Sequence, residues 1–498
     1  MWFARVVGEE IKSGEFTRAD HQRYRARVER CLNALSQLLA DNRFAPEDWR
    51  TGMEIELNLV DDDLQPFYDN AAVLQRVDPL RYQPELGLFT IELNVEPRRL
   101  GGQSLQQLES GLRAELNDAL ARARRAGAEI VMIGVLPTLP PPPPNRTWLS
   151  DSERYRALDE VIMTSRREPI LLCLDGVESL SLHVDSIAAE AACTSTQLHL
   201  QVRPERFADY WNAAQVLAGP QVALGANSPF VFGRQVQAET RIDLFMQSTD
   251  IRGPELRNQG VRPLVWFGER WITSVMDLFE ENLRYYPVLL PESSEEDPLT
   301  VLADGGIPRL AELRLHNGTI YRWNRPIYDV QGSHPHLRLE NRVLPAGPSV
   351  IDTLANAAFF SGLIVELAND ADPVWQRMPF HVAQDNFQRA AADGIEAVLW
   401  WPGVGEAPIS ELTLSHLLPT ARRGLERLEV AAEVTDRLLD VTESRARLRR
   451  NGAQWQVAAV RAAEARGATR EQALREMLGH YVRNMHANEP VHSWEVPS

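Results

Sequence analysis

Three kinds of feature are scarce in this sequence, and each scarcity narrows the possible functions. The 498 residues include three cysteines, Cys31, Cys173 and Cys193, without CxxC spacing, which indicates buried reduced thiols rather than a disulfide framework. No run of about 18 apolar residues is apparent, so we expect no membrane span. The first residues, MWFARVVGEEIKSGEF, lack the apolar core of a signal peptide. We therefore expect a cytoplasmic protein.

A surplus of positive charge is also missing. Lys and Arg number 52 against 69 Asp and Glu, which gives a net charge of −17. This balance argues against nucleic acid or an anionic membrane as a partner. With 44% hydrophobic and 24% charged residues, the composition is that of a globular protein. The length allows two or three domains, or one large domain with extensions.

Four segments alternate between apolar and polar residues, which is typical of strands with two unlike faces. In residues 51–60 the polar positions include Glu54 and Glu56. The other three segments are FTIELNVEP, TQLHLQV and LRLENRVL, at 89–97, 196–202 and 337–344. Their polar faces contain no lysine and carry Glu92, Gln197, His199, Arg338, Glu340 and Arg342.

The composition of these faces leaves two interpretations open. A sheet with one face in water produces the same alternation. Carboxylates about 7 Å apart on one face, however, repel unless cations lie between them or one is protonated. Oxygen ligands from several strands suit Mg²⁺ or Mn²⁺, and Arg338 and Arg342 suit a phosphate or a carboxylate. The pattern favours a metal-dependent enzyme with an anionic substrate and leaves the reaction open.

Helical patterns lie on either side of these strands. Residues 17–41 and 104–126 are predicted helices, with capping pairs Thr17…Asp20 and Ser104…Gln107. Five prolines at 140–144 predict a stiff, extended loop. From about residue 411 the sequence is helical with almost no strand signal. We expect a catalytic domain over 1–410 and a helical C-terminal extension over 411–498, packed on that domain and available for a homodimer contact.

Several segments resemble the glutamate–cysteine ligase type 2, or carboxylate–amine ligase, family. They are GMEIEL, PELGLFTIEL, ALGANSPF with AETR, HNGTIYRWNRPIYD and RLENRVLPAGPSVIDTLANAAFF, and they span roughly residues 50–365. The resemblance implies a glutamine synthetase-like α+β fold with a curved, mainly antiparallel sheet. It also implies that ATP activates a carboxylate, for glutamate the γ-carboxylate, as an acyl phosphate that an amine attacks, usually that of cysteine.

The resemblance also implies a set of site residues. Two or three Mg²⁺ ions would be held by Glu54, Glu56, Glu85, Glu92 and Glu340. Glu85 and Glu92 are seven residues apart and would fall on opposite faces of one strand, so Gly87 must break or bend the chain between them. Many relatives have His-x-His where this chain has Gln197-Leu198-His199, so either Gln197 or His199 serves as the ligand.

Arginines would bind the phosphate groups or the substrate carboxylate. Arg342 and Arg241 match arginines of the family, Arg338 belongs to the polar face described above, and Arg322 and Arg325 are further candidates. We expect Cys193 to be a core thiol. Two other functions remain possible: a two-metal phosphohydrolase that uses the same carboxylates, and a relative that has lost catalysis.

Overall fold

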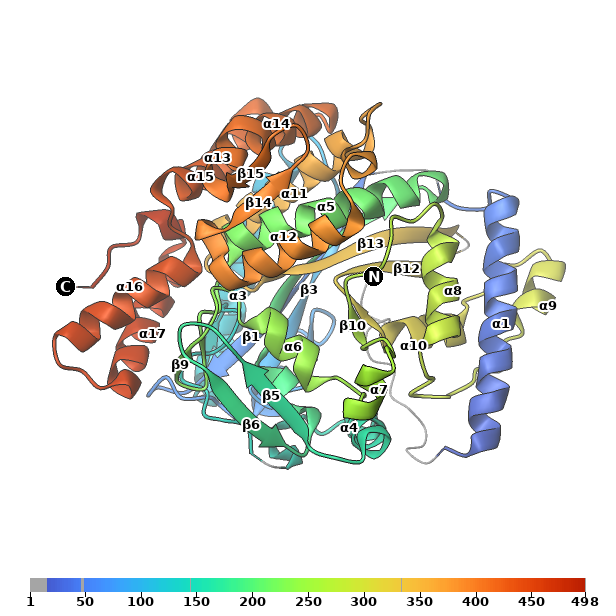
Figure 1. Ribbon diagram of the computed structural model, residues 1–498, viewed down its shortest axis with the longest axis horizontal. Coiled ribbons are helices and arrows are strands. Elements are labelled where there is room, and N and C mark those ends of the chain that lie inside the picture. Colours follow the sequence, from blue (N-terminus) through green and yellow to red (C-terminus); the bar gives the residue numbers. More distant parts are fainter. Residues whose placement is uncertain (1–15, 46–48, 144, 333, 498) are drawn as a thin grey trace.

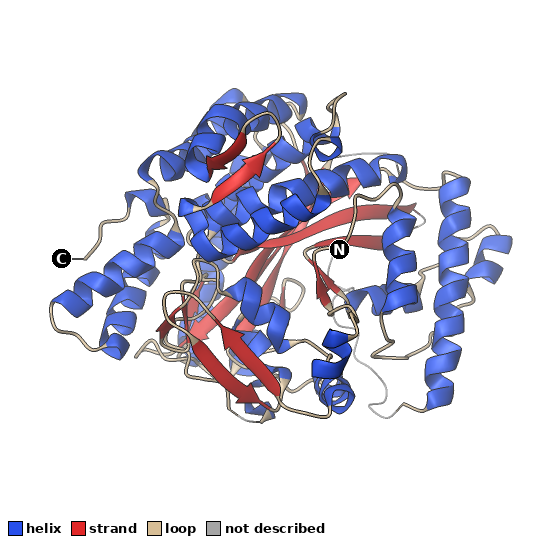
Figure 2. Ribbon diagram, in the orientation of Figure 1, coloured by secondary structure: helices blue, strands red, loops and turns tan. Residues whose placement is uncertain are grey.

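The computed structural model describes residues 16–45, 49–143, 145–332 and 334–497. Its centre is a curved antiparallel sheet with strand order β12-β13-β7-β1-β3-β2, and β4 pairs with β1. Figure 2 shows these strands in the middle of the molecule with helices around them. The strands are β1 Arg50–Val60, β2 Tyr82–Pro84, β3 Thr90–Arg99, β4 Glu129–Val131, β7 Ser195–Val202, β12 Asn324–Gln331 and β13 His334–Pro345.

Small two-stranded sheets and short helices surround this sheet. The two-stranded pairs are β5 Ile170–Leu174 with β6 Leu180–Val184, β8 Phe230–Val231 with β9 Arg234–Gln235, β10 Val265–Trp266 with β11 Tyr321–Arg322, which is parallel, and β14 Val398–Trp401 with β15 Gly405–Pro408. The short helices are α2 Asn70–Leu74, α4 Glu153–Arg166, α6 Arg241–Ser248, α7 Pro254–Asn258, α8 Val275–Tyr285, α9 Pro298–Ala303 and α10 Ala311–Gly318.

Apolar helices cover the sheet on one side (Figure 1). Helix α5, Phe207–Gly225, packs on β13 and lies between α11, Val350–Ala368, and α12, Phe380–Asp393. Within α5, the Trp211 indole donates a 2.9 Å hydrogen bond to the Asn324 carbonyl of β12. The alternating apolar residues of the strands, such as Ile55 and Leu57, are fully buried in this core.

Helix α11 is the element that bears on the expectation of no membrane span. It is the one helix among the described residues that is long and apolar enough to cross a membrane, with a mean hydropathy of 1.5. In this stretch 89% of the residues are buried inside the fold, as in the core helix of a globular protein. The expected cytoplasmic location stays a prediction, and the expectation about a signal peptide concerns residues outside the described part of the chain.

Of the two predicted helix starts, one is confirmed and one is wrong. Helix α1, Arg18–Ala40, begins with the predicted capping box of Thr17 and Asp20. Helix α3, Ser104–Ala123, begins after Gln103 without a side-chain cap, because the Ser104 hydroxyl accepts a hydrogen bond from the Gly101 amide instead. The predicted Ser104…Gln107 pair is therefore wrong. Residues 140–143 of the proline run form a loop, as expected, and residue 144 lies outside the described part.

The C-terminal helices pack on α11 and on one another. They are α13 Ile409–Leu412, α14 Leu418–Arg427, α15 Ala432–Leu448, α16 Gly452–Ala465 and α17 Arg470–Ala487. A buried ion pair joins Arg445 of α15 to Asp352 of α11, with Nη2 and Oδ1 2.7 Å apart. The boundary near residue 411 and the homodimer contact stay predictions.

Candidate active site

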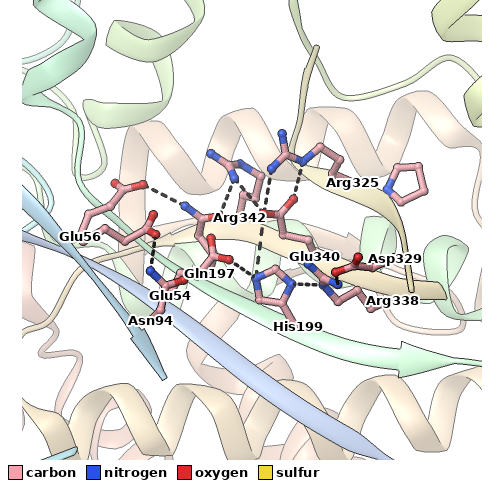
Figure 3. A network of polar contacts seen from close by, with 12 residues as sticks. Glu54, Glu56, Asn94, Gln197, His199, Arg325, Asp329, Arg338, Glu340 and Arg342 are labelled. Atoms are coloured by element: carbon pink, nitrogen blue, oxygen red, sulfur yellow. Dashed lines mark hydrogen bonds and ion pairs between the residues drawn. The ribbon is translucent and has the colours of Figure 1, made fainter. Parts of the chain in front are cut away.

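The register of the sheet brings the polar faces of the strands together. Glu54 of β1 lies opposite Gln197 of β7, and Glu56 of β1 lies opposite Glu92 of β3. Paired residues on one face of a sheet lie about 5 Å apart, so these side chains form one continuous polar surface. Figure 3 shows Glu54, Glu56 and Gln197 on it. The surface is buried: Glu54 is 1% exposed and Glu56 is 8% exposed. The alternative of a sheet face in water is therefore wrong.

Glu54, His199 and Glu340 form the first group of candidate metal ligands. Each offers a ligand atom, and these atoms lie within 4.8 Å of one another. His199 Nε2 lies 3.1 Å from Glu54 Oε1, while His199 Nδ1 accepts a 3.2 Å hydrogen bond from Arg338 Nε. Because an arginine can only donate, the proton of a neutral ring lies on Nε2, and here His199 faces Glu54 as a donor.

Glu340 is held between two guanidinium groups. Arg325 donates two hydrogen bonds to its carboxylate, one of 3.0 Å, and Arg342 Nη1 lies 3.0 Å from Glu340 Oε1. Burial would raise the pKa of Glu340, but Arg325 and Arg342 together hold this pKa below its usual range. Glu340 therefore stays ionised. The predicted Glu-x-Arg pair, Glu340 and Arg342, lies together with Arg325.

Glu56, Glu85 and Glu92 form the second group of candidate ligands, again with ligand atoms within 4.8 Å of one another. Burial and the charge of Glu85 raise the pKa of Glu56 to about 7. Burial, together with the neighbouring carboxylates, raises the pKa of Glu92 well above its usual value. Carboxyl groups with raised pKa values retain protons unless a nearby cation neutralises their charge.

The strand is interrupted around Gly87, and this interruption brings Glu85 to the second group. Strand β2 ends at Pro84 and β3 begins at Thr90, so residues 85–89 turn back between them. A Cβ atom on Gly87 would meet the Cβ of Ala191 at 3.0 Å and the Thr90 hydroxyl at 3.1 Å. Glycine fits this close approach, and the predicted break is confirmed.

The two candidate ligands of β7 have different surroundings. Gln197 Nε2 donates a 2.9 Å hydrogen bond to Glu56 Oε1, and Gln197 Oε1 accepts from Arg342. The amide oxygen of Gln197 is therefore already engaged, whereas His199 lies within the first group. The acceptor nitrogen of His199 is likewise engaged, by Arg338, so the geometry favours neither residue, and which of them is a metal ligand stays open.

The residues of the first group fit a divalent cation. Both carboxylate oxygens of Glu54 are buried, and apart from the ion-pair contact of Oε1 with the His199 ring they have no hydrogen-bond donor among the described residues. Buried polar atoms without a hydrogen bond are rare in folded proteins unless an ion or water serves them. Carboxylate oxygens are the ligands that Mg²⁺ and Mn²⁺ prefer. With the three carboxylates of the second group, the donor set suits two ions.

The other three predicted arginines, Arg241, Arg338 and Arg322, differ in how close they lie to the ligand groups. Arg241 Nε donates a 2.7 Å hydrogen bond to Glu239 Oε1, and Arg241 also donates to the Val343 carbonyl. Arg338 contacts His199 and forms a 3.1 Å ion pair with Asp329, so it reaches the first group through the histidine. Arg322 bonds Glu281 and Asn282 of α8, outside both groups.

A pocket of about 470 Å³, partly open to solvent, lies beside the second group. Arg241 and Arg342 contribute to its wall, as do Glu56 and Glu85. Cys193 also lines the pocket and is half-buried, so its assignment as a core thiol is wrong. The pocket further includes three residues that sequence reasoning missed, Glu190, Phe245 and Trp323.

A buried polar network links the C-terminal helices to the pocket. The Tyr481 hydroxyl of α17 donates to the Met132 carbonyl at 2.7 Å and accepts from Asn227 Nδ2 at 2.8 Å. The backbone amide of Asn227 donates to Glu239 Oε2 at 2.8 Å, and Glu239 in turn forms an ion pair with Arg241. The pocket wall at Arg241 is thus supported by a residue from the last helix.

Two solved structures share this fold. One is a glutamate–cysteine ligase from Francisella tularensis in complex with AMP, with a TM-score of 0.55 and 11% identity over 92% of this chain and 91% of that one. The other is a bifunctional glutathione synthetase from Pasteurella multocida, with a TM-score of 0.51 and 12% identity over 92% of this chain and 55% of that one. A search of curated protein sequences finds no match.

Fold and site together define an ATP-dependent ligase that forms amide bonds. The chain belongs to the glutamate–cysteine ligase family 2, whose model matches residues 50–491. The resemblance seen in the sequence is confirmed, as is the predicted curved antiparallel sheet. The matched region extends beyond the recognised blocks and includes most of the C-terminal helices.

Proposed function

We propose that this carboxylate–amine ligase is a glutamate–cysteine ligase, which activates the γ-carboxylate of glutamate as an acyl phosphate for attack by the amino group of cysteine. The observation that carries the proposal is the position of the second ligand group beside a pocket with two arginines, Arg241 and Arg342, in its wall, where Arg342 also contacts Glu340 of the first group. Carboxylates that can hold cations and arginines that can bind anions thereby lie within one site.

The side chains of the site have distinct parts in this proposal. Mg²⁺ or Mn²⁺ ions at the two ligand groups would neutralise the phosphate oxygens of ATP during transfer. Arg342, fixed by Glu340 and Gln197, binds a phosphate or carboxylate oxygen, and Arg241, fixed by Glu239, binds the substrate from the wall of the same pocket. Phe245 and Trp323 exclude water, which limits hydrolysis of the acyl phosphate.

The direct test is an incubation of the purified protein with ATP, Mg²⁺, glutamate and, one at a time, a panel of amino acids and amines. Mass spectrometry should find γ-glutamylcysteine together with ADP. A different amide would assign another acid or amine. Release of phosphate without any amide would favour the phosphohydrolase, and a folded protein without turnover would favour the inert relative.

Two variants test the metal groups. Glu54→Gln and Glu340→Gln should each lower metal-dependent ADP release by about 100-fold or more, because ligands that stabilise charge in the transition state contribute on that scale. Glu54→Gln is the cleaner change, since Glu340→Gln also leaves Arg325 and Arg342 without their anionic partner. Full activity of Glu54→Gln would contradict the assignment.

A further inference from the structure

Glu190 lies in the wall of the substrate pocket and belongs to neither ligand group. It sits near the end of a 3₁₀ helix, Ile187–Ala192, that leads into β7. The start of this helix is fixed, because the Ile187 amide donates a 2.7 Å hydrogen bond to the fully buried Asp159. At its end, the Cys193 amide donates to the Glu190 carbonyl at 2.9 Å. The backbone therefore holds Glu190 at the pocket.

The Glu190 carboxylate differs from the other carboxylates of the pocket wall. Glu56 accepts hydrogen bonds from the Ser195 amide and from Gln197, and Glu85 accepts one from the Leu86 amide. In the described part of the chain, no hydrogen bond or ion pair of the half-buried Glu190 side chain is found. Burial and the charges of Glu85 and Glu56 raise the pKa of Glu190 to about 8, although the charge of Arg342 acts to lower it. No described donor or cation is in hydrogen-bond or ion-pair contact with this carboxylate, so it is available to a ligand of the pocket.

The arginines of the pocket make their direct contacts with other groups. Arg342 is engaged with Glu340 and Gln197, and Arg241 is engaged with Glu239 and a backbone carbonyl. In the described part of the chain, Glu190 also has no second and third metal ligand grouped with it. A positively charged group of a ligand in the pocket can therefore contact Glu190 without displacing another partner.

Aromatic side chains near Glu190 favour an ammonium group as that charge. Phe245 and Trp323 line the same pocket, and the ring of Tyr321 meets Phe245 edge-on with centroids 5.3 Å apart. Burial, followed by the charge of Glu190, raises the pKa of Tyr321, which places this ring within the field of the carboxylate. Aromatic faces attract ammonium groups, and the attraction grows as water is excluded.

We propose that Glu190 binds the ammonium group of a substrate in this pocket, opposite the arginines that bind its anionic groups. The inference rests on the proposed function and adds to it a requirement for a positively charged substrate. The ammonium group can belong to the amino acid whose carboxylate is activated or to the amine that attacks it. Glu190 is thus a specificity-determining residue that favours amino acids over the corresponding acids without an amino group.

The test compares Glu190→Gln with Asp185→Asn, which removes the same charge from an exposed position five residues earlier. Calorimetry with ATP and Mg²⁺ present measures the binding of two matched pairs of probes. Glutamate and glutarate differ by the α-ammonium group of the acid, and cysteine and mercaptopropionate differ by the amine of the acceptor. Thermal unfolding confirms that both variants are folded.

We expect Glu190→Gln to weaken the binding of glutamate or of cysteine by about 10-fold to 100-fold, the range for loss of a hydrogen bond to a charged group. The affected pair identifies the source of the ammonium group. Glutarate and mercaptopropionate should bind the variant within about twofold of the wild type, because they lack the group that Glu190 contacts. Asp185→Asn should leave all four affinities unchanged.

Equal losses for both members of each pair would overturn the inference, and so would unchanged affinities for all four probes. A weaker Mg²⁺ or Mn²⁺ affinity with unchanged glutamate and cysteine binding would show that Glu190 is a metal ligand instead. Binding does not require turnover, so the two proposals can fail separately. A wild-type protein that forms no amide but shows the ammonium preference would refute the proposed function alone.

Discussion

Glu92→Gln removes one negative charge from the group that Glu92 forms with Glu56 and Glu85, and it keeps the shape of the side chain. The ligand atoms lie within 4.8 Å of one another, so two ionised carboxylates repel by at least about 3.5 kcal/mol at an effective dielectric constant of about 20. The group escapes part of this repulsion by retaining a proton, since burial and Glu85 raise the pKa of Glu56 to about 7. We therefore expect the variant to gain about 1–2 kcal/mol in free energy of unfolding when divalent ions are removed.

The assay is differential scanning calorimetry in EDTA and in saturating Mg²⁺. Unfolding entropies near 2.1 cal/mol/K per residue give roughly 1 kcal/mol/K for a chain of this length, so the variant should melt about 1–2 °C higher in EDTA. Mg²⁺ at about 100 times its dissociation constant should stabilise the wild type by about 2.7 kcal/mol. The variant should lose the share of that gain that comes from the ion at the second group, together with ADP release, while the first group keeps its share.

The control is Glu96→Gln, which removes the same charge from an exposed position four residues further along the same strand. It should change neither the melting temperature in EDTA nor the effect of Mg²⁺. If Glu92→Gln lowered the melting temperature in EDTA and Mg²⁺ stabilised both proteins equally, Glu92 would belong to a structural network and the reasoning would be refuted.

Three further predictions concern pH, the last helix and the thiols. Burial and Glu85 raise the pKa of Glu56 from 4.5 to about 7. The contribution of the Glu56 carboxyl group to stability is therefore complete below about pH 4.5 and is lost as the pH rises through about 7. The melting temperature in EDTA should fall over this pH window. A melting temperature that rises with pH would contradict this sign. Tyr481→Phe removes the hydroxyl that contacts Met132 and Asn227, so urea unfolding should show a loss of about 1–3 kcal/mol, and no loss would argue against the network. Burial raises the pKa of the Cys193 thiol well above its usual value, so mass spectrometry after limited iodoacetamide treatment should find the exposed Cys173 alkylated first. The reverse order would contradict the raised pKa of Cys193.

The sheet could be predicted because strands repeat with a period of two. Alternation located β1, β3, β7 and β13, and the residue types on their polar faces indicated a common site. The break at Gly87 followed from the spacing of Glu85 and Glu92, since seven residues cannot keep two side chains on one face of a continuous strand. Sequence alone did not show that both faces are buried, because that depends on the segments packed over the polar face.

The residues that were missed have no comparable pattern. Glu190 stands in a 3₁₀ helix, and its one available signal was a single charge within the alanine-rich run IAAEAA. The contact between Asn227 and Tyr481 joins residues 254 positions apart, so no local pattern could reveal it. The Ser104…Gln107 pair failed for a local reason, since the turn at Gly101 engages the serine before the helix begins.

The most direct test of the account is an X-ray experiment on crystals grown with Mn²⁺ and an ATP analogue, with anomalous difference maps recorded at the manganese edge. The account predicts one peak among Glu54, His199 and Glu340 and a second among Glu56, Glu85 and Glu92. Density for the analogue's phosphates should contact both ions and Arg342. Manganese bound elsewhere, or two groups without anomalous density beside a bound nucleotide, would contradict the claim that this buried polar face is a metal-dependent active site.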